Sequence, residues 1–262
     1  MVILDGVEKR FGVRLVVSAI TLTVPARASI ALLGPSGCGK STLLRLILGL
    51  LVPDRGRVSV AGTLVTPDTA TRVRRQIGYV IQDGGLFPHL TARENVTLLA
   101  RHLRWEKPRL EARAAELAGL VRLDAAALGR YPAELSGGER QRVGIMRALM
   151  LDPPVLLLDE PMGALDPMVR ARLQRDLKRI FAELEKTVIL VTHSLDEAAY
   201  LGDEVVLMRD GHIVQRGTMR DLERSDDAFT REFVDAQRGT QPSTQPAAQR
   251  EPSGGASAGP DA

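Results

Sequence analysis

The segment Gly34–Thr42 carries the most specific chemistry in the sequence, because it fits the pattern G-x-x-x-x-G-K-[ST]. Glycines let backbone N–H groups turn toward a phosphate, and the start of a following helix adds positive charge. Lys40 can place a charge beside the terminal phosphates, and the Ser41 hydroxyl can ligate Mg²⁺. We expect the rest of the segment to line the same nucleotide site: Gly34, Pro35, Ser36, Gly37, Cys38, Gly39 and Thr42.

Cys38 adds a second expectation, since a thiol between two glycines at a helix N-terminus and near Lys40 favours the thiolate. The alternative is that Cys38 only fills a small space in the loop. It is the one cysteine of the chain, which excludes an internal disulfide and a cysteine-built zinc site.

An apolar run from Val155 ends in the acidic pair Asp159 and Glu160. At the end of a buried strand, Asp159 can hold Mg²⁺, through water, and Glu160 can act as general base on an attacking water. Such a pair alone is more often a helix cap or a turn. Together with a phosphate loop, the catalytic interpretation is favoured.

The elements around these residues are those that the chemistry needs. Ile30–Leu33 reads as a strand, and apolar residues at helical spacing follow between positions 39 and 50, which is the context of a phosphate loop. Further strands are expected at 2–7, 19–24, 58–60, 77–81, 155–159, 187–191, 204–208 and 212–215, and further helices at 94–102, 109–121, 139–149, 166–185 and 195–201. Apolar strands separated by helices predict a mostly parallel sheet covered on both faces.

Three other polar sites lie at the ends of predicted elements. Gln82 follows a strand, His193 follows another, and Ser136 with Gly137 and Gly138 opens a helix, where they offer a hydroxyl, bare backbone and a positive dipole end. A lone glutamine after a strand says little, and a single histidine is more often a surface or core residue.

These motifs, in this order, resemble the ATP-binding subunit of an ABC transporter. The segment Leu135–Gln141 stands just upstream of the acidic pair, as in that family, and the resemblance covers residues 1 to about 236. It implies an α/β P-loop NTPase of ABC type, residues 1–237, with a mostly parallel sheet core, an N-terminal antiparallel β portion and a helical subdomain at about 91–150. It also implies ATP and Mg²⁺ as cofactors.

The resemblance gives roles to individual residues. Gln82 would contact Mg²⁺ and link nucleotide binding to a membrane partner. His193 would hydrogen-bond the γ-phosphate and orient Glu160. The loop Ser136–Gly138 would contact the γ-phosphate held by a second copy, so that the ATPase works as a homodimer. Asp166 would belong to the dimer contact, although Gly163 stands where serine is commoner, and Phe11 would stack on adenine.

Within ABC importers, the segment Gln76–Thr91 is most similar to the osmoprotectant branch, which takes up glycine betaine, choline and similar quaternary amines. That resemblance implies integral membrane permease subunits and an extracytoplasmic substrate-binding protein as partners. The alternatives are an ATPase for another importer or for lipid trafficking, and a non-transport ABC ATPase. Substrate does not touch such a subunit, so the branch is an analogy.

Composition limits the other possibilities. The net charge of +3, without aromatic residues interleaved among the basic ones, argues against a nucleic-acid partner. No apolar run reaches the ~18 residues of a membrane span, and the N-terminus does not read as a secretory signal. We therefore expect a peripheral protein on the cytoplasmic face of the membrane. The polar, small-residue stretch 238–262 is expected to be a disordered tail.

Overall fold

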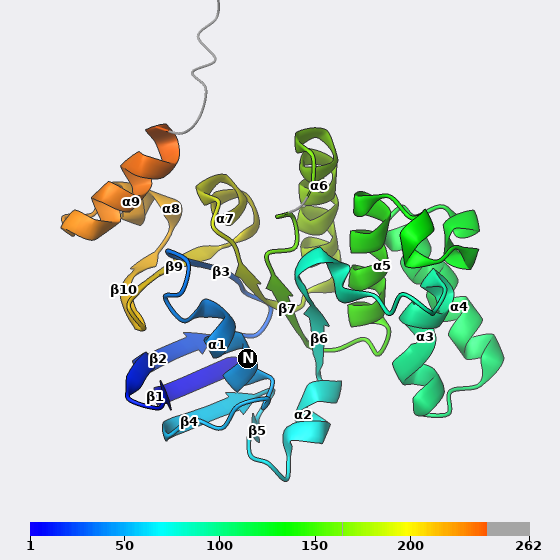
Figure 1. Ribbon diagram of the computed structural model, residues 1–262, viewed down its shortest axis with the longest axis horizontal. Helices are drawn as coiled ribbons and strands as arrows, with labels where there is room; N and C mark the ends of the chain where they lie inside the picture. The colour runs from blue at the N-terminus through cyan, green and yellow to red at the C-terminus, as the bar shows by residue number, and fades with distance from the viewer. Residues whose placement is uncertain (164, 240–262) are drawn as a thin grey trace, which may run out of the picture.

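The computed structural model describes residues 1–163 and 165–239. Its strands form two sheets, with helices packed around the larger one (Figure 1). The strands are β1 (Val2–Phe11), β2 (Arg14–Val24), β3 (Ser29–Leu33), β4 (Arg55–Val60), β5 (Thr63–Leu64), β6 (Ile77–Val80), β7 (Val155–Asp159), β8 (Thr187–Val191), β9 (Glu204–Arg209) and β10 (His212–Gly217).

The α-helices cover these sheets and fill the connections. They are α1 (Lys40–Ile47), α2 (Ala70–Arg75), α3 (Ala92–His102), α4 (Lys107–Leu120), α5 (Gly137–Leu149), α6 (Pro167–Leu184), α7 (Leu195–Leu201), α8 (Met219–Glu223) and α9 (Ala228–Gly239). Short 3₁₀ segments η1 (Gln82–Gly85), η2 (Ala125–Gly129) and η3 (Pro132–Glu134) lie within the middle third.

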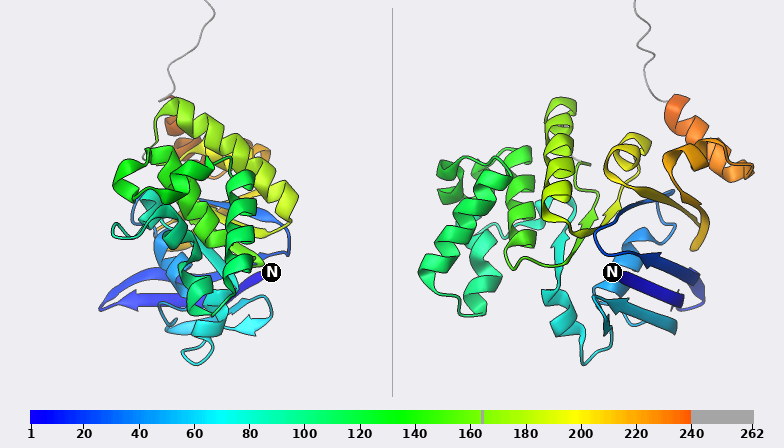
Figure 2. Two further views of the ribbon diagram at one scale, coloured as in Figure 1. Left: turned by 90° about the vertical axis from the view of Figure 1, so that its right-hand side faces the viewer. Right: turned by 180° about the vertical axis from the view of Figure 1, so that it is seen from behind.

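The N-terminal sheet is antiparallel, in the order β2-β1-β4-β5, as predicted for that part of the chain. The larger sheet has the order β10-β9-β3-β8-β7-β6 and is parallel except for the pair β9 and β10. Seen from behind, the antiparallel sheet lies on the opposite side of the larger sheet from α3, α4 and α5 (Figure 2). The predicted fold class is confirmed.

Alternate residues of the parallel strands face different cores, as the two-residue period of a strand requires. Ile189 and Val191 of β8 join the core shared with β1, β2 and α1, whereas Val188 and Leu190 join the core under α5 and α6. Because both faces are covered, β8 is buried along its whole length. Burial on both faces fixes the positions of the strand ends, and the strand ends in turn position the loops that follow them.

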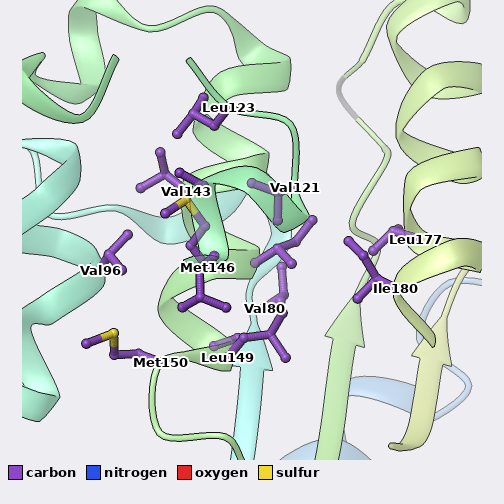
Figure 3. Close-up of a cluster of buried hydrophobic side chains, with 14 of the residues drawn as sticks. Val80, Val96, Val121, Leu123, Val143, Met146, Leu149, Met150, Leu177 and Ile180 are labelled. Carbon is purple, nitrogen blue, oxygen red and sulfur yellow. The ribbon is translucent and has the colours of Figure 1, made fainter. Parts of the chain in front are cut away.

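The second of these cores extends into the predicted helical subdomain. Its side chains come from β6, α3, α5, α6 and the segment after α4, and Met146 of α5 lies near the middle of the group (Figure 3). This shared core fastens α5, the last helix of the helical subdomain, to the larger sheet.

Two parts of the C-terminal third differ from the sequence expectations. Helices α8 and α9 were not expected, and Arg238 and Gly239 belong to α9 rather than to a tail. The physical reason is the amphipathic pattern of α9, in which Phe233 and Val234 pack on a third core with β3 and β9. The rest of the expected tail, residues 240–262, lies outside the described residues.

Candidate functional site

The predicted site residues follow four neighbouring parallel strands. The sheet aligns Leu32 of β3 with Val191 of β8, Val191 with Asp159 of β7, and Leu158 with Val80 of β6. Since the carboxyl ends of parallel strands meet at one edge, the loops after them share one location. The phosphate loop, His193, the acidic pair and Gln82 therefore converge, although the sequence separates the phosphate loop from His193 by more than a hundred positions.

The phosphate loop has a conformation that requires its glycines. Gly34, Gly37 and Gly39 have φ values of 146°, 80° and 109°. A Cβ on Gly34 would lie 2.2 Å from the carbonyl oxygen of Met208, and one on Gly39 would lie 2.7 Å from that of Val16. The loop is thus pressed against the backbone of β2 and β9, and larger residues do not fit at these two positions.

Lys40 lies buried inside this loop, where its Nζ donates to the carbonyl oxygens of Gly34 at 2.7 Å and Pro35 at 3.0 Å. Within the described part of the chain, no carboxylate pairs with it. A buried ammonium that is held by two carbonyls, without a carboxylate partner, attracts an anion strongly. With the α1 N-terminus beside it, the loop fits the phosphates of a nucleotide.

Cys38 is buried in the core under the loop, and its carbonyl accepts a hydrogen bond from the Gly211 amide at 3.1 Å. Its Sγ lies 3.8 Å from the Nζ of Lys40. The thiolate stays a prediction. Because the sulfur is covered, a thiol reagent reaches it only when the loop is displaced.

Asp159 ends β7 half-buried and accepts a hydrogen bond from the Tyr79 hydroxyl at 3.2 Å. Burial raises the pKa of Asp159, and it also raises the pKa of Tyr79, to about 12, with the nearby carboxylate adding to that effect. A bound cation stabilises the charged form of a partly desolvated carboxylate that has only a hydroxyl partner. Tyr79 is a contact that sequence reasoning missed, since 80 residues separate it from Asp159.

The donors at this edge suit Mg²⁺. A carboxylate at Asp159 and a hydroxyl at Ser41 are hard oxygen ligands, and Mg²⁺ commonly takes only one or two carboxylates and completes its shell with water and phosphate. Among the described residues, no three His, Cys, Asp or Glu side chains stand together as a metal cage. The site therefore fits a metal that arrives with its nucleotide.

Glu160 and His193 face each other across the ends of β7 and β8. The Nδ1 of His193 lies 3.7 Å from Oε2 of Glu160, which is near but too long for a direct hydrogen bond. The His193 side chain is 64% exposed and that of Glu160 is 28% exposed. Glu160 has a φ of 46°, and its amide donates to the carbonyl of Val191 at 2.9 Å, so its backbone is fixed at an uncommon conformation.

Gln82 begins η1 and is exposed beside an apolar groove. The segment is held by Arg147 of α5, whose guanidinium donates to the carbonyl oxygens of Gly84 and Gly85, both at 2.9 Å. Burial lowers the pKa of Arg147. Sequence reasoning did not find Arg147, because its partners precede it by more than 60 residues and are backbone atoms.

Ser136 caps α5, and its hydroxyl accepts from the amide of Glu139 at 3.2 Å while the Glu139 carboxylate accepts from the Ser136 amide at 2.8 Å. These hydrogen bonds lower the pKa of Glu139. Beside them, Gly138 approaches α6 so closely that a Cβ would lie 2.7 Å from Cγ1 of Val169. Within the described residues, no hydrogen bond joins Ser136, Gly137 or Gly138 to the phosphate loop, so their contact with nucleotide stays a prediction.

Among the described residues, no side-chain hydrogen bond or ring contact joins Asp166 or Phe11 to the phosphate loop either. Asp166 caps α6 and accepts from the amides of Met168 and Val169 at 3.1 and 3.0 Å. Phe11 ends β1 with 47% of its surface exposed and the Nζ of Lys9 5.9 Å from its ring centre. An exposed ring can stack on a base, but the structure tests neither that role nor the dimer contact of Asp166.

Comparison with known proteins places this geometry in context. The ABC transporter family matches residues 17–163. The chain is 41% identical over 240 residues to the choline transport ATP-binding protein OpuBA of Bacillus subtilis (strain 168), covering 91% of this chain and 63% of that protein. It is 48% identical to the sulfate/thiosulfate import ATP-binding protein CysA of Bordetella bronchiseptica, over 83% of this chain and 62% of CysA. The chain thus spans less than two thirds of the length of both relatives.

A solved structure gives the same result for the fold. The dimeric post-hydrolysis structure of the ATP-binding cassette MJ0796, bound to ADP and Pi, matches with a TM-score of 0.76 at 34% identity and covers 84% of this chain and 99% of that one. In the part of this chain that the structure describes, no helix has both the length and the apolar character needed to cross a membrane.

Proposed function

This chain belongs to the ABC transporter family, and we propose that it is an ATP-hydrolysing subunit that drives transport through a separate membrane permease. The observation that carries the proposal is the edge of the parallel sheet, where Lys40, Asp159, Glu160 and His193 follow neighbouring strands. That arrangement supports the proposal that a phosphate cradle, a metal ligand and a general base share one loop cluster.

The surroundings of each residue suggest its role in ATP binding or hydrolysis. Lys40 exchanges its two carbonyl partners for the terminal phosphates of ATP. Asp159 and Ser41 would hold Mg²⁺, together with Gln82, which follows the next strand of the sheet. Bound Mg²⁺ neutralises charge on the phosphates. Glu160 takes a proton from the attacking water, and His193 lies close enough to orient that carboxylate.

A second copy of the chain completes the site in this proposal. Ser136 is exposed and Gly137 half-buried at the N-terminus of α5, and no hydrogen bond among the described residues joins them to the phosphate loop, yet they form the kind of helix start that binds anions. We propose that they contact the γ-phosphate held by the partner in a homodimer, with Asp166 and Phe11 in the roles that the resemblance gives them. The MJ0796 neighbour is itself described as dimeric.

The permease is proposed to dock in the apolar groove beside Gln82. This groove has a volume of about 330 Å³ and is lined by residues of α3, α5, β6 and η1. Its exposed large apolar side chains are Ile81, Phe87, Leu98 and Leu99. Exposed apolar patches of this kind mark interaction sites, and a short amphipathic helix of a permease fits such a groove. The subunit would then lie peripherally at the cytoplasmic membrane face, with residues 1–237 acting as one ATPase unit.

For the cargo we propose osmoprotectants such as choline or glycine betaine, delivered by an extracytoplasmic binding protein. Support comes from the segment Gln76–Thr91 and from the similarity to OpuBA, a choline transport ATP-binding protein. The similarity to CysA supports a different cargo, sulfate or thiosulfate, and keeps another importer as the second candidate.

One experiment separates the ATPase from the cargo. The purified protein should hydrolyse ATP in the presence of Mg²⁺, and Lys40→Ala should lose most of that activity. In a strain without other uptake systems, deletion of the gene should reduce radiolabelled choline or betaine uptake, and Lys40→Ala should not restore it. If deletion leaves choline and betaine uptake unchanged, the proposed cargo becomes sulfate. If Lys40→Ala keeps full ATPase activity, the assignment of the chain as an ATPase is contradicted.

A further inference from the structure

His193 is exposed and has little of its own to hold it in place. Its side chain is 64% exposed, and the approach to Glu160 at 3.7 Å is its one ion-pair contact within the described residues. A side chain in that situation is positioned through its backbone. The two residues beside it, Thr192 and Ser194, are accordingly the ones to examine.

Both neighbours are tied to Glu197 of α7, Thr192 through the buried Glu197 carboxylate and Ser194 through the Glu197 backbone amide. The hydroxyl of Thr192 donates to Oε2 of Glu197 at 2.5 Å and accepts from the amide of Ser194 at 3.1 Å. The hydroxyl of Ser194 accepts from the amide of Glu197 at 3.3 Å. These hydrogen bonds form a closed loop that starts and ends at Glu197 and brackets His193.

This loop of hydrogen bonds is anchored in the protein interior. Thr192 is 1% exposed and Glu197 is 7% exposed. The Thr192 amide donates to the carbonyl of Leu32 at 3.2 Å, on the strand that leads into the phosphate loop. A buried carboxylate is costly unless it is hydrogen-bonded, and here it has the Thr192 hydroxyl and lies in the first turn of α7, where the helix dipole favours a negative charge.

We propose that Glu197 is a positioning residue for the ATPase reaction, which acts through Thr192 to hold His193 in reach of Glu160 and the γ-phosphate. This rests on the proposed function, since it requires that His193 takes part in hydrolysis. Glu197 touches neither nucleotide nor water in this role. Its removal is expected to disturb the chemical step more than ATP binding, because Lys40 and the phosphate loop are held independently.

The test compares steady-state ATPase kinetics of matched variants. Glu197→Ala and Thr192→Val should each lower kcat by about tenfold or more while the KM for ATP changes little, as expected when a catalytic group is misplaced. Glu197→Gln keeps an oxygen that accepts from the hydroxyl, and Thr192→Ser keeps the hydroxyl, so both should retain most of the activity. The exposed Glu232→Ala on α9 serves as a control with wild-type kinetics.

Two further measurements separate positioning from simple stabilisation. The double variant Thr192→Val/Glu197→Ala should have the kcat of either single variant, since both remove one interaction. In a His193→Ala background, single-turnover assays should show no additional loss from Glu197→Ala. Thermal unfolding with saturating ATP identifies variants that are merely unfolded.

The opposing results are distinct. Wild-type kcat in folded Glu197→Ala, or an equal loss in the His193→Ala background, would overturn the positioning role. A wild-type protein without Mg²⁺-dependent hydrolysis would instead overturn the proposed function.

Discussion

In the proposed function, single residues at the sheet edge divide into those that bind phosphate and those that act on water. Glu160 is held by backbone hydrogen bonds in a left-handed conformation, with its side chain partly exposed beside His193. Such a carboxylate can approach a water molecule without being needed for the fold. Binding and catalysis should therefore be separable by substitution.

We predict that Glu160→Gln lowers hydrolysis by at least ~100-fold while ATP binding persists, because the amide keeps the shape but cannot take a proton. The unhydrolysed nucleotide should then hold two copies together. Size-exclusion chromatography with ATP and Mg²⁺ should show a dimer for Glu160→Gln and a smaller species for Lys40→Ala. Near-normal turnover of Glu160→Gln would remove Glu160 from the role of base.

The phosphate loop offers a prediction about the fold at the same scale. A methyl group on Gly34 would meet the Met208 carbonyl at 2.2 Å, whereas a methyl group on Gly37 meets no atom within 4 Å. Gly34→Ala should therefore lower the unfolding temperature and abolish ATP binding. Gly37→Ala, strained only by its φ of 80°, should be milder in thermal unfolding. An equal loss in both would show that backbone conformation, rather than contact with β9, dominates.

The sequence indicated most residues of this edge, because each sits at the end of a local pattern: a glycine-rich loop, an apolar run or a strand followed by one polar residue. It did not indicate the partners that hold them. Tyr79, Arg147 and Glu197 look ordinary in the sequence, and their contacts form only when distant strands and helices pack. The local sequence predicts which face of a strand a residue occupies. It does not predict the hydrogen-bond partner that a distant strand or helix supplies.

At the scale of elements, the N-terminus of α5 combines a structural cap with a proposed ligand contact. The Ser136 and Glu139 hydrogen bonds lower the pKa of Glu139, so its folded value lies below its unfolded value. The resulting stabilisation is present above the unfolded pKa and is lost as pH falls toward the folded value. Glu139→Gln should accordingly lower the unfolding temperature at pH 7. Below about pH 4 the unfolding temperature of the variant should approach that of the wild type. Thermal unfolding across this pH range checks it, and a difference that is independent of pH would contradict the ionic cap.

A buried ion pair links α6 to α5. Asp176 has only 5% of its side chain exposed, and its Oδ2 lies 2.7 Å from the guanidinium of Arg142, with Arg122 at 3.3 Å from Oδ1. Asp176→Ala leaves the largely buried Arg142 guanidinium without its carboxylate partner and should cost about 3 kcal/mol, at the low end for a buried pair. The exposed pair of Asp5 with Arg57 is the matched control, where Asp5→Ala should cost about 0–1 kcal/mol. Urea unfolding measures the free energy of unfolding of both variants. Equally small decreases in the two would mean that water solvates Arg142 after the substitution.

For the whole molecule, the strand order explains what patterns along the chain could not. The antiparallel sheet, the parallel sheet and the helical part were expected from periodicity and resemblance, but the order β3-β8-β7-β6 places the functional loops side by side only after folding. Helices α8 and α9 were missed because α8 is short and the polar composition after α9 dominated the interpretation of the C-terminus. The same packing leaves an apolar groove between α3 and α5, beside the Gln82 segment.

That groove yields a prediction that separates coupling from catalysis. Leu99 of α3 is 43% exposed at the groove and makes no contribution to the phosphate loop. A charge there opposes an apolar partner, so Leu99→Glu should abolish uptake and association with the permease while the isolated subunit keeps its ATPase activity. Leu50→Glu, with 55% of its residue exposed outside the groove, is the matched control and should support normal uptake. Normal uptake by Leu99→Glu would place the permease contact elsewhere, whereas loss of basal ATPase activity would show that the groove and the sheet edge are not independent. Arg147 lines the groove and donates to two backbone carbonyls of the Gln82 segment, so a partner in the groove can affect the proposed Mg²⁺ site. The uptake assay measures that connection.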